Sequence, residues 1–156
     1  MEAFTVRNGA WVVIGDGKKA LILHNEGDAD LLNLRRVSVR EQVNPPTREQ
    51  GSDAGGRASS TVGGRGGSMG ETDWHQIEEE RFAASLAEDL NVAAREHRFK
   101  ELVVVAPPKT LAELRREWTK ETQKLIVAEI PKDYTHHPIP EIETMLRSHR
   151  PEPVST

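Results

Sequence analysis

The chain has 156 residues, a length that fits one domain, because typical domains contain about 100–200 residues. Aromatic residues make up only 4% of the chain, so a core would have to be built mainly from Leu, Val, Ile and Ala. The formal net charge of −4 argues against a protein that coats nucleic acid over its whole surface, although a local basic patch stays compatible with it. The absence of cysteine excludes disulfides, thiolate nucleophiles and zinc sites that need Cys.

The N-terminus has no basic segment followed by an apolar run, as an export signal would have. No stretch of the chain approaches the roughly 18 consecutive apolar residues of a membrane-spanning helix. We therefore expect a cytoplasmic protein without a membrane span.

Short apolar runs separated by turn residues occupy the first forty positions. This pattern is typical of antiparallel strands joined by tight turns. The runs lie at about 10–16, 19–25 and 31–41, and the turns at Asp16-Gly17 and Gly27-Asp28. The sequence therefore predicts an antiparallel meander at the start of the domain.

The third run changes phase, because its apolar residues alternate out of step on the two sides of Arg35-Arg36. This slip predicts a bulge near that pair. The stretch Gly15–Ala20 matches the glycine pattern of dinucleotide-binding turns, but such a turn must be followed by a helix. A strand follows here instead, so we interpret the stretch as a hairpin turn.

Glycine is concentrated in one segment, since eight of the twelve lie between Gly51 and Gly70. We expect a mobile loop at about 44–73, because glycine favours conformational freedom and the segment offers no apolar face to bury. Two glycine pairs in it precede an arginine, and free backbone amides beside guanidinium groups suit phosphate contact. The candidate binding residues are Gly55, Gly56, Arg57, Gly63, Gly64 and Arg65. A plain linker fits the same composition.

The pattern becomes helical after this segment. Apolar residues fall at helical spacing from Asp73 to about Arg98, and Asp73 with Gln76 resembles a capping box. The remaining elements are a buried strand at 102–106, a helix with Leu111, Leu114, Arg115 and Trp118 on one side, a strand at 125–130, and a helix from Pro140 to about Ser148. The order β-β-β-α-β-α-β-α predicts an α/β domain at 10–147 with a mixed five-stranded sheet, the layout of the ribonuclease-H-like fold. Residues 1–9 would be an extension and 148–156 a tail.

Nuclease chemistry on such a fold needs carboxylates that converge on two metal ions. The first strand is apolar until Asp16 at its end, and the fourth ends in Ala-Pro-Pro-Lys at 106–109. We therefore expect neither a metal-dependent nuclease nor a bound metal or cofactor. A possible polar site follows the last strand, at Lys132, Asp133, Thr135 and His136. Hydrogen bonding among Asp133, Thr135 and the next helix is its expected role, and ligand binding or acid–base chemistry is the alternative.

Four segments in the same order resemble the bacterial host-attachment protein family, described as "protein required for attachment to host cells". They are Trp11–Ala20, Glu78–Ala83, Leu102–Lys109 and Glu129–His136. That family is similar in turn to the middle domain of archaeo-eukaryotic peptide-chain release factors, a ribonuclease-H-like domain.

The resemblance gives the glycine-rich segment a meaning. In release factors, a loop between the sheet and the long helix carries Gly-Gly-Gln, whose glutamine positions the water that cleaves peptidyl-tRNA. Here Arg57, Arg65 and Ser68 follow the glycine pairs instead. The resemblance therefore implies a translation-associated module without catalysis that contacts ribosome or tRNA through a Gly/Arg loop. The alternatives are a host-cell attachment factor acting by protein contact and a peptidyl-tRNA or ester hydrolase using Asp133 and His136.

Overall fold

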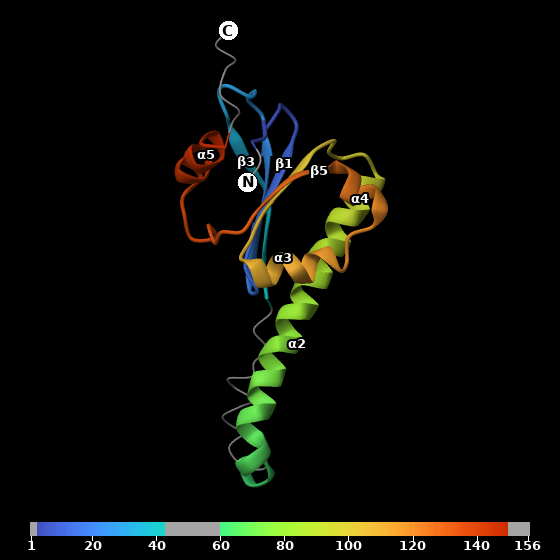
Figure 1. Ribbon diagram of the computed structural model, residues 1–156, viewed down its shortest axis with the longest axis vertical. Coiled ribbons are helices and arrows are strands. Elements are labelled where there is room, and N and C mark those ends of the chain that lie inside the picture. Colours follow the sequence, from blue (N-terminus) through green and yellow to red (C-terminus); the bar gives the residue numbers. More distant parts are fainter. Residues whose placement is uncertain (1–2, 43–59, 150–156) are drawn as a thin grey trace.

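The computed structural model describes residues 3–42 and 60–149, and the side chains of residues 60–73 lie outside this description. Its elements in chain order are β1 (Trp11–Gly15), β2 (Lys19–Asn25), β3 (Leu34–Glu41), α2 (Ser60–Arg95), β4 (Leu102–Val105), α3 (Pro108–Arg115), α4 (Lys120–Leu125), β5 (Ile126–Ile130) and α5 (Ile139–Arg147) (Figure 1). The predicted α/β class with a mixed five-stranded sheet is confirmed. Among the described helices, none is both long and apolar enough to cross a membrane.

The sheet has the strand order β3-β2-β1-β4-β5. β1 pairs with β2 in antiparallel register and with β4 in parallel register, and β4 pairs with β5 in parallel register. Gly15 faces Ala20 across the tight turn between β1 and β2. The interpretation of Gly15–Ala20 as a hairpin turn is therefore confirmed.

The predicted bulge in β3 is confirmed one residue further along the chain. Ile22 faces Ser38 and Leu23 faces Arg36, so Val37 is left between two paired positions. This extra residue explains the change of phase in the sequence, because it turns the side chains beyond it to the other face.

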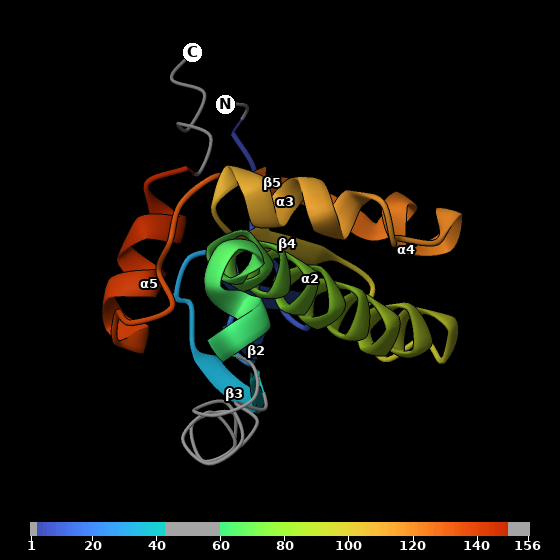
Figure 2. The same ribbon diagram turned by 90° about the horizontal axis from the view of Figure 1, so that it is seen from below.

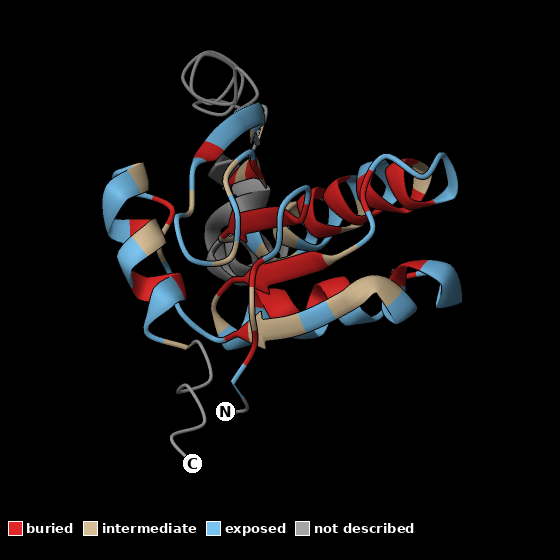
Figure 3. Cartoon of the chain, turned by 90° about the horizontal axis from the view of Figure 1, so that it is seen from above, coloured by how far each residue is buried: buried red, intermediate tan, exposed pale blue. Residues whose placement is uncertain are grey.

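Alternate residues of β1 enter two cores on opposite faces of the sheet. Trp11 and Val13 pack with apolar side chains of α2 and α3, whereas Val12 and Ile14 pack with those of α5. Figure 2 shows α5 on one side and α2, α3 and α4 on the other, and Figure 3 shows the buried residues along the central strands and inner helix faces. Phe4, before β1, is buried in the α5 core, and its amide donates to the carbonyl of His149 at 3.0 Å.

Helix α2 begins at Ser60, so the prediction of a helix start with a cap at Asp73 is wrong. The predicted loop at 44–73 is therefore wrong for residues 60–73, and residues 44–59 lie outside the described residues. Nucleating a helix is costly but extending one is cheap, since each added residue gains a backbone hydrogen bond. The packed part of α2 supplies the nucleus, and local composition gives no sign of this extension.

The segment predicted as one helix around Trp118 forms two short helices, α3 and α4. The chain turns between them at Trp118, which is buried against α2. The hydroxyl of Thr119 accepts the amide of Thr122 at 3.2 Å and so caps α4. A Thr in this position starts a new helix, because its side chain satisfies an amide that has no partner within the helix.

Candidate functional site

Three parallel strands bring polar residues from distant parts of the chain to one edge of the sheet. Asp16 follows β1, Lys109 lies just beyond β4, and Asp133 and Thr135 follow β5. Because β1, β4 and β5 run in the same direction, their carboxyl ends meet at this edge. We call it the carboxyl edge, and it contains most of the polar site predicted from the sequence.

Thr135 joins two carboxylates at the carboxyl edge. Its Oγ1 lies 2.7 Å from Oδ1 of Asp133 and 3.0 Å from Oδ2 of Asp16, and the residue is only 2% exposed. The second oxygen of Asp16 accepts the backbone amides of Lys18 and Lys19, both at 2.7 Å. This arrangement ties the loop after β5 to the hairpin between β1 and β2.

Hydrogen bonding lowers the pKa of Asp133 below its ordinary value. The largest cause is the bond from the Thr135 hydroxyl, and burial opposes it by raising the pKa. The backbone amide of Thr135 and the nearby His136 and His137 lower the pKa further. A general base works best with a pKa near the operating pH, so these contacts make Asp133 a poor one.

A cavity of about 460 Å³ opens beside the carboxyl edge, between the β2–β3 face and the loop before α5. Lys19, Arg36, His136 and His137 line it together with apolar side chains, and no carboxylate is among its lining residues. His137 Nδ1 lies 2.8 Å from Oε1 of Glu141, which ties this loop to α5. The described residues hold no group of three or more side chains that could bind a metal ion. The chemistry of the cavity suits an anion.

The structure places two of the four predicted site residues, Thr135 and His136, at the cavity, and Asp133 is joined to it through Thr135. Lys132 is exposed and does not line the cavity, whereas Thr135 and His136 do. Asp16 lies 119 positions before Thr135, and the sequence did not indicate that the two residues are in contact. The contact depends on the sheet, in which β1, β4 and β5 run parallel and end on the same side.

Helix α2 lies beside the carboxyl edge at the point where its N-terminal part meets the body of the domain. Glu79 accepts the Lys109 ammonium at 3.1 Å, and it lies so close to the β1–β2 turn that a Cβ at Gly17 would meet its Cγ at 2.8 Å. One turn earlier, Gln76 donates to Glu80 at 2.7 Å and to Glu113 of α3 at 3.2 Å. From Trp74 on, where the side chains of the helix are described, the first buried one is Phe82.

Glu113 is the buried acid at this junction of α2 and α3. It is 3% exposed, and its Oε1 has no hydrogen-bond partner among the described residues. Burial raises the pKa of Glu113 above its ordinary value, and the charges of Glu79 and Glu80 raise it further. Lys109 and the hydrogen bond from Gln76 act in the opposite direction.

The part of α2 before this junction extends beyond the sheet (Figure 1). We call residues 60–75 of α2 the arm. The backbone of Gly63, Gly64 and Arg65 is helical and belongs to the arm, so the prediction of a loop at these residues is wrong. Gly55, Gly56 and Arg57 lie outside the described residues.

Comparison with known proteins gives two results. The family model described as bacterial archaeo-eukaryotic release factor family 12 matches residues 9–146. An uncharacterized protein of Rickettsia prowazekii is 33% identical over 74 residues, which are 46% of this chain and 49% of that relative. The chain thus spans about half the length of the curated relative it matches.

The family match includes all five strands, the long helix with its arm, and the carboxyl edge. It supports the release-factor part of the resemblance found in the sequence. The chain belongs to bacterial archaeo-eukaryotic release factor family 12.

Proposed function

We propose that this protein is a translation-associated module that contacts the ribosome or tRNA through its Gly/Arg segment and does not hydrolyse peptidyl-tRNA. The observation that carries the proposal is the arm. A helix of 36 residues is about 54 Å long at about 1.5 Å per residue, whereas the seven residues of β2 span only about 23 Å. In a chain of the release factor family, such a projection is suited to reach a partner that the body of the domain does not touch.

Phosphate contact through the arm and the segment before it rests on individual arginines, because Glu49, Asp53, Glu71 and Asp73 offset the positive charge of this stretch. The chain has a net charge of −4, and the junction of the arm with the body carries Glu78, Glu79 and Glu80. These acids repel an RNA backbone. Arg57 and Arg65 each follow a glycine pair, and they precede this acidic junction in the sequence. Phosphate contact is therefore expected at these arginines.

Two observations support a role without catalysis. None of the glycine pairs is followed by glutamine, which positions the attacking water in release factors. At the carboxyl edge, the Thr135 hydroxyl lowers the pKa of Asp133, which works against a hydrolase that would use Asp133 and His136 as its acid–base pair.

Ribosome co-sedimentation at several salt concentrations tests the contact. Phosphate contacts release counterions, so we expect binding to weaken steeply with salt, with a log–log slope of roughly −0.7 per contact to single-stranded RNA. The double variant Arg57→Ala/Arg65→Ala should flatten this slope by roughly 1.4. The matched control Lys120→Ala/Lys124→Ala removes the same charge from exposed positions of α4 and should leave the slope unchanged. Equal slopes for wild type and the arginine variant would refute contact through these arginines.

A peptide-release assay tests the absence of catalysis. Ribosomes that hold peptidyl-tRNA are incubated with the wild-type protein, and we expect the peptide to stay attached. Efficient release would overturn the non-catalytic proposal, and loss of that release in His136→Ala would instead assign the activity to the carboxyl edge.

The resemblance to host-attachment proteins supplies the competing function. An attachment factor that acts by protein contact must be exported, whereas the proposed module must share a compartment with ribosomes. Cell fractionation distinguishes the two. A protein recovered at the cell surface, and absent from ribosome fractions at low salt, would favour attachment.

A further inference from the structure

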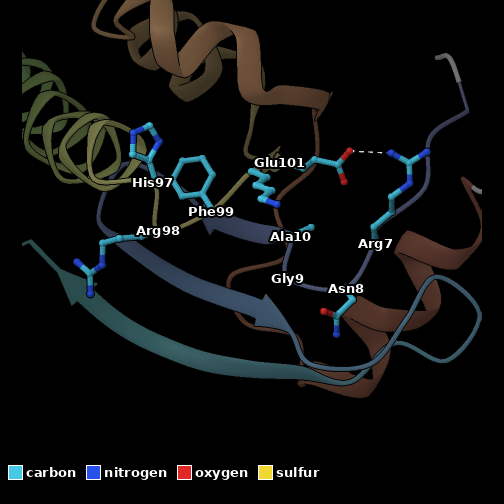
Figure 4. A pocket seen from close by; sticks show the side chains of 9 residues that line it. Arg7, Asn8, Gly9, Ala10, His97, Arg98, Phe99 and Glu101 are labelled. Atoms are coloured by element: carbon cyan, nitrogen blue, oxygen red, sulfur yellow. Dashed lines mark hydrogen bonds and ion pairs between the residues drawn. The ribbon is translucent and has the colours of Figure 1, made fainter.

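A second cavity, of about 560 Å³, opens at the end of the sheet opposite the carboxyl edge. Its lining comes from two stretches that are far apart in the sequence, residues 7–10 before β1 and residues 97–101 between α2 and β4. The parallel pairing of β1 with β4 brings them together, and the amide of Trp11 donates to the carbonyl of Glu101 at 2.9 Å. Figure 4 shows the two stretches side by side.

The cavity carries a surplus of positive charge in an acidic chain. Arg7, Arg98 and Lys100 line it, and Glu101 is its one acidic lining residue. Glu101 pairs with Arg7 at 2.9 Å. Neither Arg98 nor Lys100 forms an ion pair with any residue that the structure describes. Their charge is available to a ligand.

The two guanidinium groups are positioned before any ligand arrives. Glu101 orients Arg7, and the guanidinium of Arg98 lies 6.0 Å from the centroid of the Trp11 ring, which packs on Phe99. In Figure 4, Arg7 and Arg98 stand on opposite sides of the backbone at Gly9-Ala10. Guanidinium groups match phosphate geometry with two donors each, so both side chains are suited to contact phosphates at the cavity.

His97 occupies a backbone position that glycine usually takes. It has a φ of 60° at the end of α2, where its amide donates to the carbonyl of Ala94 at 3.0 Å and the next amide, of Arg98, donates to Ala93 at 2.9 Å. This double hydrogen bond is a Schellman motif, in which glycine is preferred because it has no Cβ. A strained residue with a side chain points to a function for that side chain. Its imidazole lies at the rim of the cavity, beside Phe99 (Figure 4).

We propose that this cavity binds the phosphate backbone of an RNA, as a second contact that deepens the proposed function and rests on it. The backbone of α2 between Arg65 and Arg95 spans about 45 Å at about 1.5 Å per residue, so one RNA that touches both ends must extend over at least this distance. The side chain of Arg7 is 70% exposed. Small ligands are mostly enclosed by their sites, whereas cations on an open rim suit a strand that passes across.

The test measures binding of unfractionated tRNA to the full chain at salt concentrations from about 50 mM to about 200 mM. The variant Arg98→Ala/Lys100→Ala should weaken binding about tenfold at low salt and reduce the log–log slope by roughly 1.4. Lys120→Ala/Lys124→Ala removes the same charge outside the cavity and should bind as wild type does. A further variant, His97→Gly, should weaken tRNA binding while thermal stability is kept or raised, because glycine relieves the backbone strain.

A second readout locates the ligand directly. Addition of tRNA to the wild-type protein should shift the amide NMR signals of Gly9, Phe99 and Lys100. Binding that is unchanged in Arg98→Ala/Lys100→Ala, or equally weakened in the α4 control, would overturn the inference, as would the absence of tRNA binding at about 50 mM salt. If the cavity variant loses tRNA binding but the wild type fails to co-sediment with ribosomes and Arg57→Ala/Arg65→Ala still binds tRNA normally, the proposed function fails and the cavity inference stands.

Discussion

Thr135 offers one hydroxyl to two carboxylates, and this makes it a sensitive position at the carboxyl edge. Thr135→Val keeps the shape of the side chain but removes the donor to Asp133 and Asp16. We expect the free energy of unfolding to fall by about 1.5–3 kcal/mol, the usual contribution of a hydrogen bond to a charged group. Urea denaturation measures this loss. The control Thr144→Val, at an exposed position of α5, should change stability by less than about 0.5 kcal/mol. A loss equal to that of the control would mean that the Thr135 bonds are not maintained in solution.

Thr135→Val should also change how the stability of the protein depends on pH. The pKa of Asp133 in the folded protein lies below the ordinary 3.8, so its contribution to stability is fully present above pH 3.8. This contribution is lost as the pH falls through the lowered value. Thr135→Val removes the largest cause of the shift. The stability difference between wild type and variant should therefore narrow as the pH falls below 3.8.

Glu113 should show the opposite pH dependence. Its pKa in the folded protein lies above the ordinary 4.5, so the fold favours the protonated form. The stabilisation from this proton is greatest below pH 4.5 and is lost as the pH rises through the raised value. Glu113→Gln keeps the shape of the side chain, is neutral like the protonated acid, and retains an oxygen that can accept from Gln76. We expect the variant to unfold at a higher urea concentration than wild type at pH 7 and to lose this advantage below pH 4.5.

The matched control for Glu113→Gln is Glu117→Gln, two positions after α3, where the side chain is exposed. The stability of Glu117→Gln relative to wild type should be the same at pH 7 and below pH 4.5. If Glu113→Gln were less stable than wild type at pH 7, the buried carboxylate would have a partner that favours its charged form.

At the scale of the elements, Asn91 fastens α2 to the turn between α3 and α4. Its side-chain amide donates to the carbonyl of Glu117 at 3.0 Å, and its oxygen accepts the Thr119 amide at 3.1 Å and the Thr122 hydroxyl at 2.7 Å. Asn91→Ala removes two partly buried hydrogen bonds and takes this acceptor from the fully buried Thr122 hydroxyl. We expect the free energy of unfolding to fall by more than about 2 kcal/mol, because several members of one hydrogen-bond network lose their partner at once.

Thermal or urea denaturation measures the effect of Asn91→Ala. Glu88→Ala changes the exposed side of the same helix and should stay within about 0.5 kcal/mol of wild type. Comparable losses in the two variants would mean that α4 docks through its apolar contacts alone.

Elements whose residues carry a clear periodicity could be predicted from the sequence. The strands and the β3 bulge follow from alternation, since a phase shift of one residue leaves a visible mark in an exposed strand. The start of α2 could not be predicted, because Gly63 and Gly64 cost about 1 kcal/mol each in a helix and argue locally for a loop. The break at Trp118 could not be predicted, because Leu111, Leu114 and Trp118 keep helical spacing across it.

At the scale of the whole molecule, the sites differ in how much the sequence reveals. Asp133 and Thr135 are two positions apart, so their hydrogen bond was within reach of sequence reasoning. The contact of Asp16 with these two residues depends instead on the order of the strands in the sheet. The cavity that contains Arg7 and Arg98 could not be predicted, because its two stretches meet only when β1 pairs with β4.

The pairing of β1 with β4 also determines the order of folding. Each partner in this ladder lies 91 positions from the other, as Trp11 does from Leu102, whereas partners in the β1–β2 hairpin lie 5 to 13 positions apart. Closing a long loop costs entropy before any contact repays it, so the hairpin should form first. In stopped-flow experiments, Ile22→Ala should mainly slow refolding, and Val103→Ala should mainly speed unfolding. The reverse pattern would mean that β4 joins the folding nucleus.

This order has a consequence while the chain is being made. At about 5–20 residues per second, β4 emerges about 5–18 s after β1. During this interval, β1 offers an unpaired apolar edge, Trp-Val-Val-Ile, to any other strand it meets. An exposed edge of this kind is a template for aggregation. The long helix, which separates β1 from β4 in the sequence, therefore also lengthens the period in which this edge of the nascent chain is unpaired.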